Sequence, residues 1–158
     1  MVLTFCQWLE NSSLGWTIRD STWLFPAIEA IHLIALAMIG GAVLIVDLKL
    51  LGVGLRRQPA WQLADEAKPW LVSSLAVMIV SGVALFSSEA TKCYATPAFW
   101  YKMTALAAAT LFTFTARASV LRSNSLRAGT TLAGRTVAVL SLSLWSIVGV
   151  SGRAIGFY

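Results

Sequence analysis

Charged residues are scarce in this chain. Asp, Glu, Lys and Arg make up 12% of its 158 residues, whereas 58% are hydrophobic, and an ordinary soluble domain carries roughly a quarter charged residues. A soluble globular domain is therefore excluded, and intrinsic disorder is excluded as well, because disorder requires low hydrophobicity and high charge. Two cysteines are too few for a disulfide-rich secreted scaffold. The class that remains is an integral membrane protein.

A strict alternation of apolar and polar residues is also missing, which argues against a transmembrane barrel of strands. Long uncharged runs are present instead, and a spanning helix needs about 20 apolar residues. These runs predict an all-α fold, a bundle of four transmembrane helices within a single membrane domain (residues 1–158). The predicted spans cover residues 23–46, 70–88, 99–116 and 136–156.

The segment before the first predicted span is too short to cross a bilayer. Val2, Phe5 and Leu9 lie at helical spacing, with Gln7 and Glu10 on the opposite face, and this pattern is typical of a short helix lying in the membrane interface. The segment lacks a basic start and a small-residue cleavage site, so we expect the first span to act as the insertion signal.

Cations are unequally divided between the two sides of the predicted bundle. The two loops that follow the first and third spans carry eight cations, and the opposite side carries four. The positive-inside rule then places both loops in the cytoplasm and both termini outside. The net charge of +5 reflects this bias and predicts contact with the lipid bilayer rather than with nucleic acid. The eight are Lys49, Arg56, Arg57, Lys68, Arg117, Arg122, Arg127 and Arg135, and the four are Arg19, Lys92, Lys102 and Arg153.

Ionisable residues at membrane depth are costly, and each one is a functional hypothesis. Glu29 and His32 lie three residues apart in the first span and therefore share a helix face. Arg153 lies one turn from the outer end of the fourth span. Because these two spans run in opposite directions, Glu29 and Arg153 come to a comparable depth, and an ion pair between them is the predicted way to keep both charges.

His32 is the only histidine in the chain. In one interpretation it is a neutral imidazole that hydrogen-bonds to Glu29, to a serine or to a backbone carbonyl. In the other it is a ligand of haem b or of a transition metal, since imidazole is a common ligand of both. Glu29 would then be a second metal ligand. A thioether from Met38, Met78 or Met103 would complete a haem site within the chain, with Met78 as the leading candidate. A haem held by two histidines would require a homodimer.

Both cysteines, Cys6 and Cys93, lie on the predicted outer side of the membrane. In a bacterium that compartment is oxidising, so a disulfide is allowed there. A pair of unlinked thiols is the alternative, because sequence cannot place the two residues within bonding distance.

Several motifs, in order along nearly the whole chain, resemble a family of small four-helix bacterial inner-membrane proteins of unknown function. They are the run from Phe25 to His32 (FPAIEAIH), Asp47 to Gly52 (DLKLLG), Ala95 to Lys102 (ATPAFWYK) and Ser151 to Tyr158 (SGRAIGFY). The resemblance implies the fold and a bacterial inner membrane, in which the cation count places both termini on the periplasmic side. It implies no activity.

Three classes of function remain. The main hypothesis is an accessory subunit in haem-based redox chemistry or metal handling, suggested by the predicted cluster of His32, Glu29 and Arg153. The alternatives are a structural subunit of a larger membrane complex, and a module that binds or transports a small anion or a proton, with Arg153 attracting the charge. Enzymatic catalysis is the least supported class, because the sequence offers no nucleophile motif, phosphate loop or metal-ligand cluster of recognised spacing.

Overall fold

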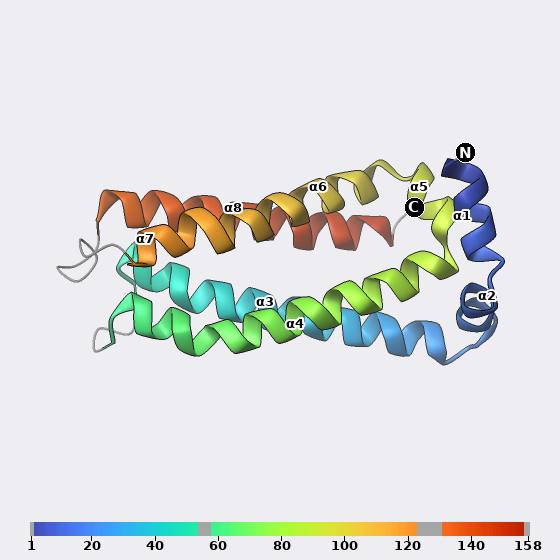
Figure 1. Cartoon of the computed structure of the whole chain (residues 1–158), viewed down its shortest axis with the longest axis horizontal. Coiled ribbons are helices and arrows are strands. Elements are labelled where there is room, and N and C mark those ends of the chain that lie inside the picture. The colour runs from blue at the N-terminus through green and yellow to red at the C-terminus, as the bar shows by residue number, and fades with distance from the viewer. Residues whose placement is uncertain (1, 54–57, 123–130, 157–158) are drawn as a thin grey trace.

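A computed structural model describes residues 2–53, 58–122 and 131–156, and the regular structure in these ranges is helical (Figure 1). The elements in chain order are α1 (Val2–Glu10), α2 (Ser13–Asp20), α3 (Leu24–Leu51), α4 (Ala60–Ser88), α5 (Ala90–Ala95), α6 (Pro97–Phe112), the π-helix η1 (Thr113–Arg117), α7 (Ala118–Arg122) and α8 (Leu132–Ile155).

Four helical segments are long and apolar enough to cross a membrane: α3, α4, the continuous segment from α6 through α7, and α8. They form an antiparallel bundle (Figure 1). The four predicted spans are thus confirmed as helices, but the helices are longer than predicted. For example, α3 continues to Leu51 and α4 already begins at Ala60. Charged residues mark the limits of the apolar core, and a helix can continue past them because long charged side chains reach into the interface.

The two ends of the bundle differ (Figure 1). One end, here called the cap end, carries α1, α2 and α5 together with the start of α3 and the end of α8. The other, here called the loop end, carries the end of α3, the start of α4, α7 and the start of α8. The described cations follow this division, with Lys49, Lys68, Arg117, Arg122 and Arg135 at the loop end and Arg19, Lys92, Lys102 and Arg153 at the cap end. Arg56, Arg57 and Arg127 lie outside the described residues.

Local sequence explains several helix boundaries. At the end of α3, Gly52 adopts a positive φ of 88°, and its N–H donates to the carbonyl of Lys49, which is a backbone conformation that glycine adopts at little cost. Pro97 opens α6 at a position where its missing N–H is not needed. At the start of α8, the Thr131 hydroxyl accepts a hydrogen bond from the Gly134 N–H at 3.1 Å.

Small and branched apolar side chains fill the core of the bundle. Ile39, Met78 and Val148 are at most 2% exposed, and Ala105 and Ala109 of α6 allow that helix to pack closely on α8. Large apolar side chains such as Val80, Leu111 and Val150 point outward instead. An apolar outer surface is expected of helices whose solvent is lipid, so the burial pattern agrees with four membrane-crossing helices.

The short helix predicted before the first span is present as α1, and a second short helix, α2, follows it. The Ser12 side chain caps α2 by accepting the Gly15 N–H at 3.2 Å. Gly15 lies so close to α4 that an added Cβ would be 2.5 Å from the Ser87 carbonyl oxygen. The sequence did not predict α2, because its signals are one capping serine and a glycine whose role depends on a distant helix.

Candidate functional site

A cavity of about 430 Å³ lies inside the cap end of the bundle. All four long segments and α5 contribute to its wall. The ionisable residues and the thiol that line it are Glu29 and His32 from α3, Glu89 after α4, Lys92 and Cys93 from α5, Lys102 from α6 and Arg153 from α8. The three residues of the predicted polar cluster, Glu29, His32 and Arg153, therefore lie around one cavity, with Lys102 as an additional member.

The His32 imidazole is held against α4 through Ser81. The His32 Nδ1 atom lies 2.9 Å from the Ser81 Oγ atom, and the Ser81 hydroxyl lies 2.6 Å from the Val77 carbonyl oxygen. A carbonyl only accepts, so the single hydroxyl proton of Ser81 goes to Val77, and Ser81 Oγ accepts the N–H of His32 Nδ1. This assigns His32 the tautomer in which Nδ1 carries the proton.

The second ring nitrogen of His32 contacts a lysine from the opposite side of the cavity. His32 Nε2 lies 3.2 Å from Lys102 Nζ. In the assigned tautomer Nε2 has a free lone pair, and an ammonium group has donors only, so Lys102 donates to His32. The Lys102 stem passes α8 at Gly152, where an added Cβ would be 3.5 Å from it.

Gly82 allows this arrangement on α4. A Cβ at this position would lie 3.2 Å from His32 Cε1, tighter than an ordinary van der Waals contact. With glycine there, the imidazole rests directly against the α4 backbone while both ring nitrogens keep their partners.

Glu29 and Arg153 are both exposed and both line the cavity. No ion pair among the described residues joins them, so the structure does not form the predicted pair. Lys102 was not predicted as a member of this cluster, although it lies within the predicted third span, residues 99–116. Its signal was available, since Lys102 lies one turn and a half after Pro97, the first residue of α6.

The donor set around His32 does not favour a metal or haem iron. Both ring nitrogens already have partners, Ser81 and Lys102. Met78 is 2% exposed, packs in the apolar core and is not among the residues that line the cavity. Among the described residues, no group of three His, Cys, Asp or Glu side chains is arranged to hold a metal ion.

Cys6 and Cys93 are free thiols, so the predicted disulfide is not formed in the structure. The helices that carry them, α1 and α5, do pack against each other. Cys6 is buried, whereas Cys93 lines the cavity. Burial raises the pKa of the Cys93 thiol, and the Glu89 carboxylate raises it further, while Lys102 and Lys92 oppose part of that effect.

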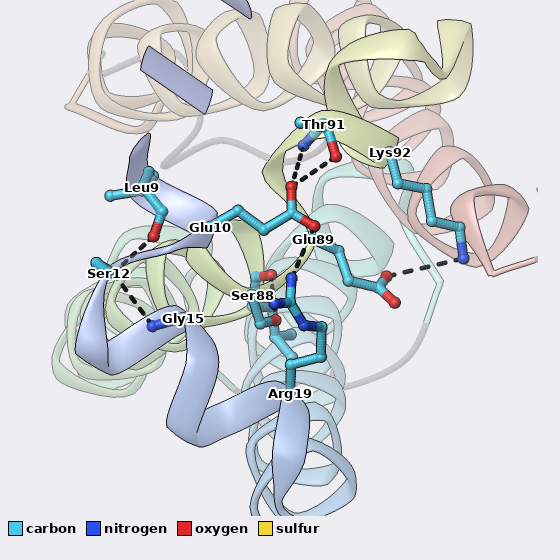
Figure 2. A network of polar contacts seen from close by, with 10 residues as sticks. Leu9, Glu10, Ser12, Gly15, Arg19, Ser88, Glu89, Thr91 and Lys92 are labelled. Atoms are coloured by element: carbon cyan, nitrogen blue, oxygen red, sulfur yellow. Dashed lines mark hydrogen bonds and ion pairs between the residues drawn. The ribbon is translucent and has the colours of Figure 1, made fainter. Parts of the chain in front are cut away.

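At the cap end, the Glu10 carboxylate lies between Arg19 and Thr91 (Figure 2). Glu10, the last residue of α1, accepts hydrogen bonds from Arg19 Nη1 of α2 at 2.9 Å and from the N–H and hydroxyl of Thr91 in α5. Beside it, Lys92 and Glu89 form an ion pair at 3.7 Å. The Glu10 side chain thus joins α1, α2 and α5. Glu89 and Lys92, which line the cavity, lie next to this junction.

A second polar pair, which is buried and was not predicted from the sequence, lies at the loop end. Arg117 Nε donates to Asp47 Oδ1 at 2.9 Å, and Arg117 Nη2 donates to the Val43 carbonyl at 3.3 Å. Asp47 Oδ2 and the Ser141 hydroxyl are buried without a hydrogen-bond partner among the described residues. The π-helix η1 carries Arg117, and π turns inside α-helices often occur at functional sites.

Comparisons with known proteins identify a family and no individual relative. Neither the curated proteins nor the solved structures include a match to this chain. The model of a family of unknown function, DUF6644, matches residues 5–158, which is nearly the whole chain. The chain therefore belongs to that uncharacterised family.

Proposed function

We propose that this protein is a membrane-embedded binding module for a small anion, held in the cap-end cavity by Lys102. One observation carries the proposal. The Lys102 ammonium lies in the cavity with a neutral imidazole as its partner, and among the described residues no carboxylate lies within ion-pair distance of it.

An ammonium group without a counter-ion is costly away from water, and a bound anion would remove that cost. Lys102 has three N–H donors, of which one is used by His32. The remaining donors can bind a carboxylate or an inorganic oxyanion. Because His32 is neutral in the assigned tautomer, it positions the ammonium without cancelling its charge.

The rest of the cavity fits a small organic anion. Its volume of about 430 Å³ lies within the range of small-molecule sites, about 300–1,000 Å³. Phe86 of α4 and Phe99 of α6 both line it and stack with ring centroids 5.3 Å apart. An apolar wall beside a cation favours a carboxylate attached to a small apolar body.

This function agrees better with the geometry than the redox hypothesis does. Binding an iron or another metal at His32 would require the imidazole to give up Ser81 or Lys102. Binding an anion leaves both contacts in place and uses Lys102 donors that have no other partner in the part of the chain that the structure describes.

The binding test compares anions with neutral molecules of the same shape. Purified full-length protein in detergent is titrated with benzoate, acetate and phosphate, and with benzamide and acetamide, by isothermal calorimetry. We expect an anion to bind and its neutral counterpart not to. Lys102→Met should weaken binding more than tenfold, because losing one partner of a buried charge pair costs about 2 kcal/mol or more and about 1.4 kcal/mol is tenfold.

Arg135→Gln is the matched control, because Arg135 is exposed on α8 at the opposite end of the bundle. It should bind as the wild type does. His32→Gln should weaken binding less than Lys102→Met, since it leaves the ammonium in the cavity. Equal binding by wild type and Lys102→Met would refute the proposal, and so would the absence of binding by every anion.

We also propose that the cap end faces the periplasm of a bacterial inner membrane. The excess of cations at the loop end supports this orientation. A reporter that is active only in the periplasm should give signal when fused after residue 158 and none when inserted after residue 57. The opposite pattern would place the cavity on the cytoplasmic side.

A further inference from the structure

A second hollow lies at the loop end, far from the cavity already described. It is a groove of about 530 Å³ between α4 on one side and η1 and α7 on the other. The close helix pairs are α3 with α4, α3 with α8, and α6 with α8, whereas α4 and α6 do not pack closely in the described part of the chain. The stacked rings of Phe86 and Phe99 fill the seam between α4 and α6 at the cap end, and at the loop end the same side of the bundle is hollow.

The groove is lined partly by apolar residues and partly by ionisable residues. Its apolar part comes from three helical segments and includes Val46 of α3, Leu71 of α4 and Phe114 of η1. Its ionisable part comprises Lys68, Arg117 and Arg122 against a single carboxylate, Asp65.

Arg117 links the groove to the buried pair. Its Nε and Nη2 atoms are used by Asp47 and by the Val43 carbonyl, and among the described residues Nη1 has no partner. Arg117 is 4% exposed and lines the groove. The groove therefore has a guanidinium in its inner wall with one nitrogen still able to donate.

The position of the groove along the bundle matches that of a lipid headgroup. Arg122 is the last residue of α7, and Lys68 lies about two turns from the start of α4; both are exposed. Trp61, which is 44% exposed, also lines the groove, and tryptophan is enriched where headgroups meet acyl chains. Cations at this depth attract anionic lipids.

We propose that this groove binds one anionic glycerophospholipid. Its phosphate is held by Lys68 and Arg122, with Arg117 Nη1 behind them, because arginine and lysine are the side chains that bind phosphate. One acyl chain lies along Val46, Leu71 and Phe114. A free phosphate would leave that apolar wall uncovered, and an apolar helix of another subunit would leave the cations without a counter-ion.

The test measures lipid retention by the full-length chain. Protein is reconstituted in nanodiscs of equal parts phosphatidylglycerol and phosphatidylcholine, released in the mass spectrometer, and its lipid adducts are counted. We expect one retained phosphatidylglycerol. The double variant Lys68→Gln with Arg122→Gln should lower the ratio of retained phosphatidylglycerol to retained phosphatidylcholine at least tenfold. Arg135→Gln should leave that ratio unchanged.

A second variant tests the apolar wall without changing charge. Ala64→Trp adds a large side chain to the groove from α4 and should also abolish the preference for phosphatidylglycerol, while glycerol phosphate should fail to compete. Equal retention of both lipids by the wild type would overturn the proposal. Loss of the preference in Arg135→Gln, or full competition by glycerol phosphate, would overturn it as well, because those results indicate general surface charge or a free-phosphate site.

Discussion

The buried pair of Asp47 and Arg117 gives the sharpest test of how this bundle is held together. Asp47 is fully buried, and the Arg117 side chain is 5% exposed. Replacing Arg117 by Met keeps the apolar stem but leaves the Asp47 carboxylate without its cation. Since Asp47 Oδ2 already lacks a partner among the described residues, neither carboxylate oxygen would then be satisfied.

Breaking a buried ion pair in this way typically costs about 3–5 kcal/mol. We therefore expect Arg117→Met to lower the free energy of unfolding by about that amount. The double variant Asp47→Asn with Arg117→Met should recover a large part of the loss, because the uncompensated charge is then absent. The interaction energy of the cycle should lie near the upper part of the usual range of about 0.5–3 kcal/mol.

The assay is equilibrium unfolding in mixed micelles with increasing dodecyl sulfate, followed by circular dichroism. Arg135→Met is the control, because Arg135 is exposed at the same end of the bundle, and its effect should stay within about 0.5 kcal/mol. If the losses of the two single variants simply add in the double variant, Asp47 and Arg117 do not stabilise each other and the reasoning is refuted.

Three further predictions concern the cap end. Gly15→Ala should loosen α2, because the new Cβ would be 2.5 Å from the Ser87 carbonyl oxygen; hydrogen exchange should speed up in residues 13–20 and not in α8, and unchanged exchange would contradict the close packing. Glu10→Gln should cost no more than about 1 kcal/mol in the same unfolding assay, since the pair with Arg19 is partly exposed, and a larger loss would show that the junction of short helices stabilises the whole bundle. In a Cys6→Ser background, alkylation of Cys93 by iodoacetamide should be slow at neutral pH and should keep rising with pH beyond the point where an exposed cysteine levels off. The raised pKa keeps its thiol protonated, and a rate that levels off near neutral pH would contradict it.

The sequence predicted what depends on local composition. Apolar runs are long enough to identify the four spans, and the amphipathic spacing near Val2 identified α1. The grouping of Glu29, His32 and Arg153 around one cavity also followed, because antiparallel spans bring residues at matching depths together. The partners of His32 did not follow, since Ser81 and Lys102 contact it only through the rotation of α4 and α6 relative to α3.

The Asp47–Arg117 pair shows a different limit. Both residues were treated as markers of where a span ends. Asp47 lies one turn before the end of α3, and Arg117 lies at a similar distance from the end of α7. Both segments run toward the loop end of the bundle, so the two residues lie at a matching depth, as Glu29 and Arg153 do on spans that run in opposite directions. This match was not predicted because the predicted spans ended too early, at residues 46 and 116.

The π turn at Thr113–Arg117 connects α6 to α7. The number of residues in it therefore affects both polar sites at the loop end, the Asp47–Arg117 pair and the groove. A π turn accommodates an extra residue relative to an uninterrupted α-helix, and one residue corresponds to a rotation of about 100° around the helix axis. If residues 113–117 wound as a regular α-helix without losing a residue, α7 would turn away from its present side, and Arg122 could no longer line the groove with α4. Loss of one residue together with regular winding would instead keep α7 on its present side. In relatives of this chain, the length of this turn is therefore as informative as the identity of the residues in it.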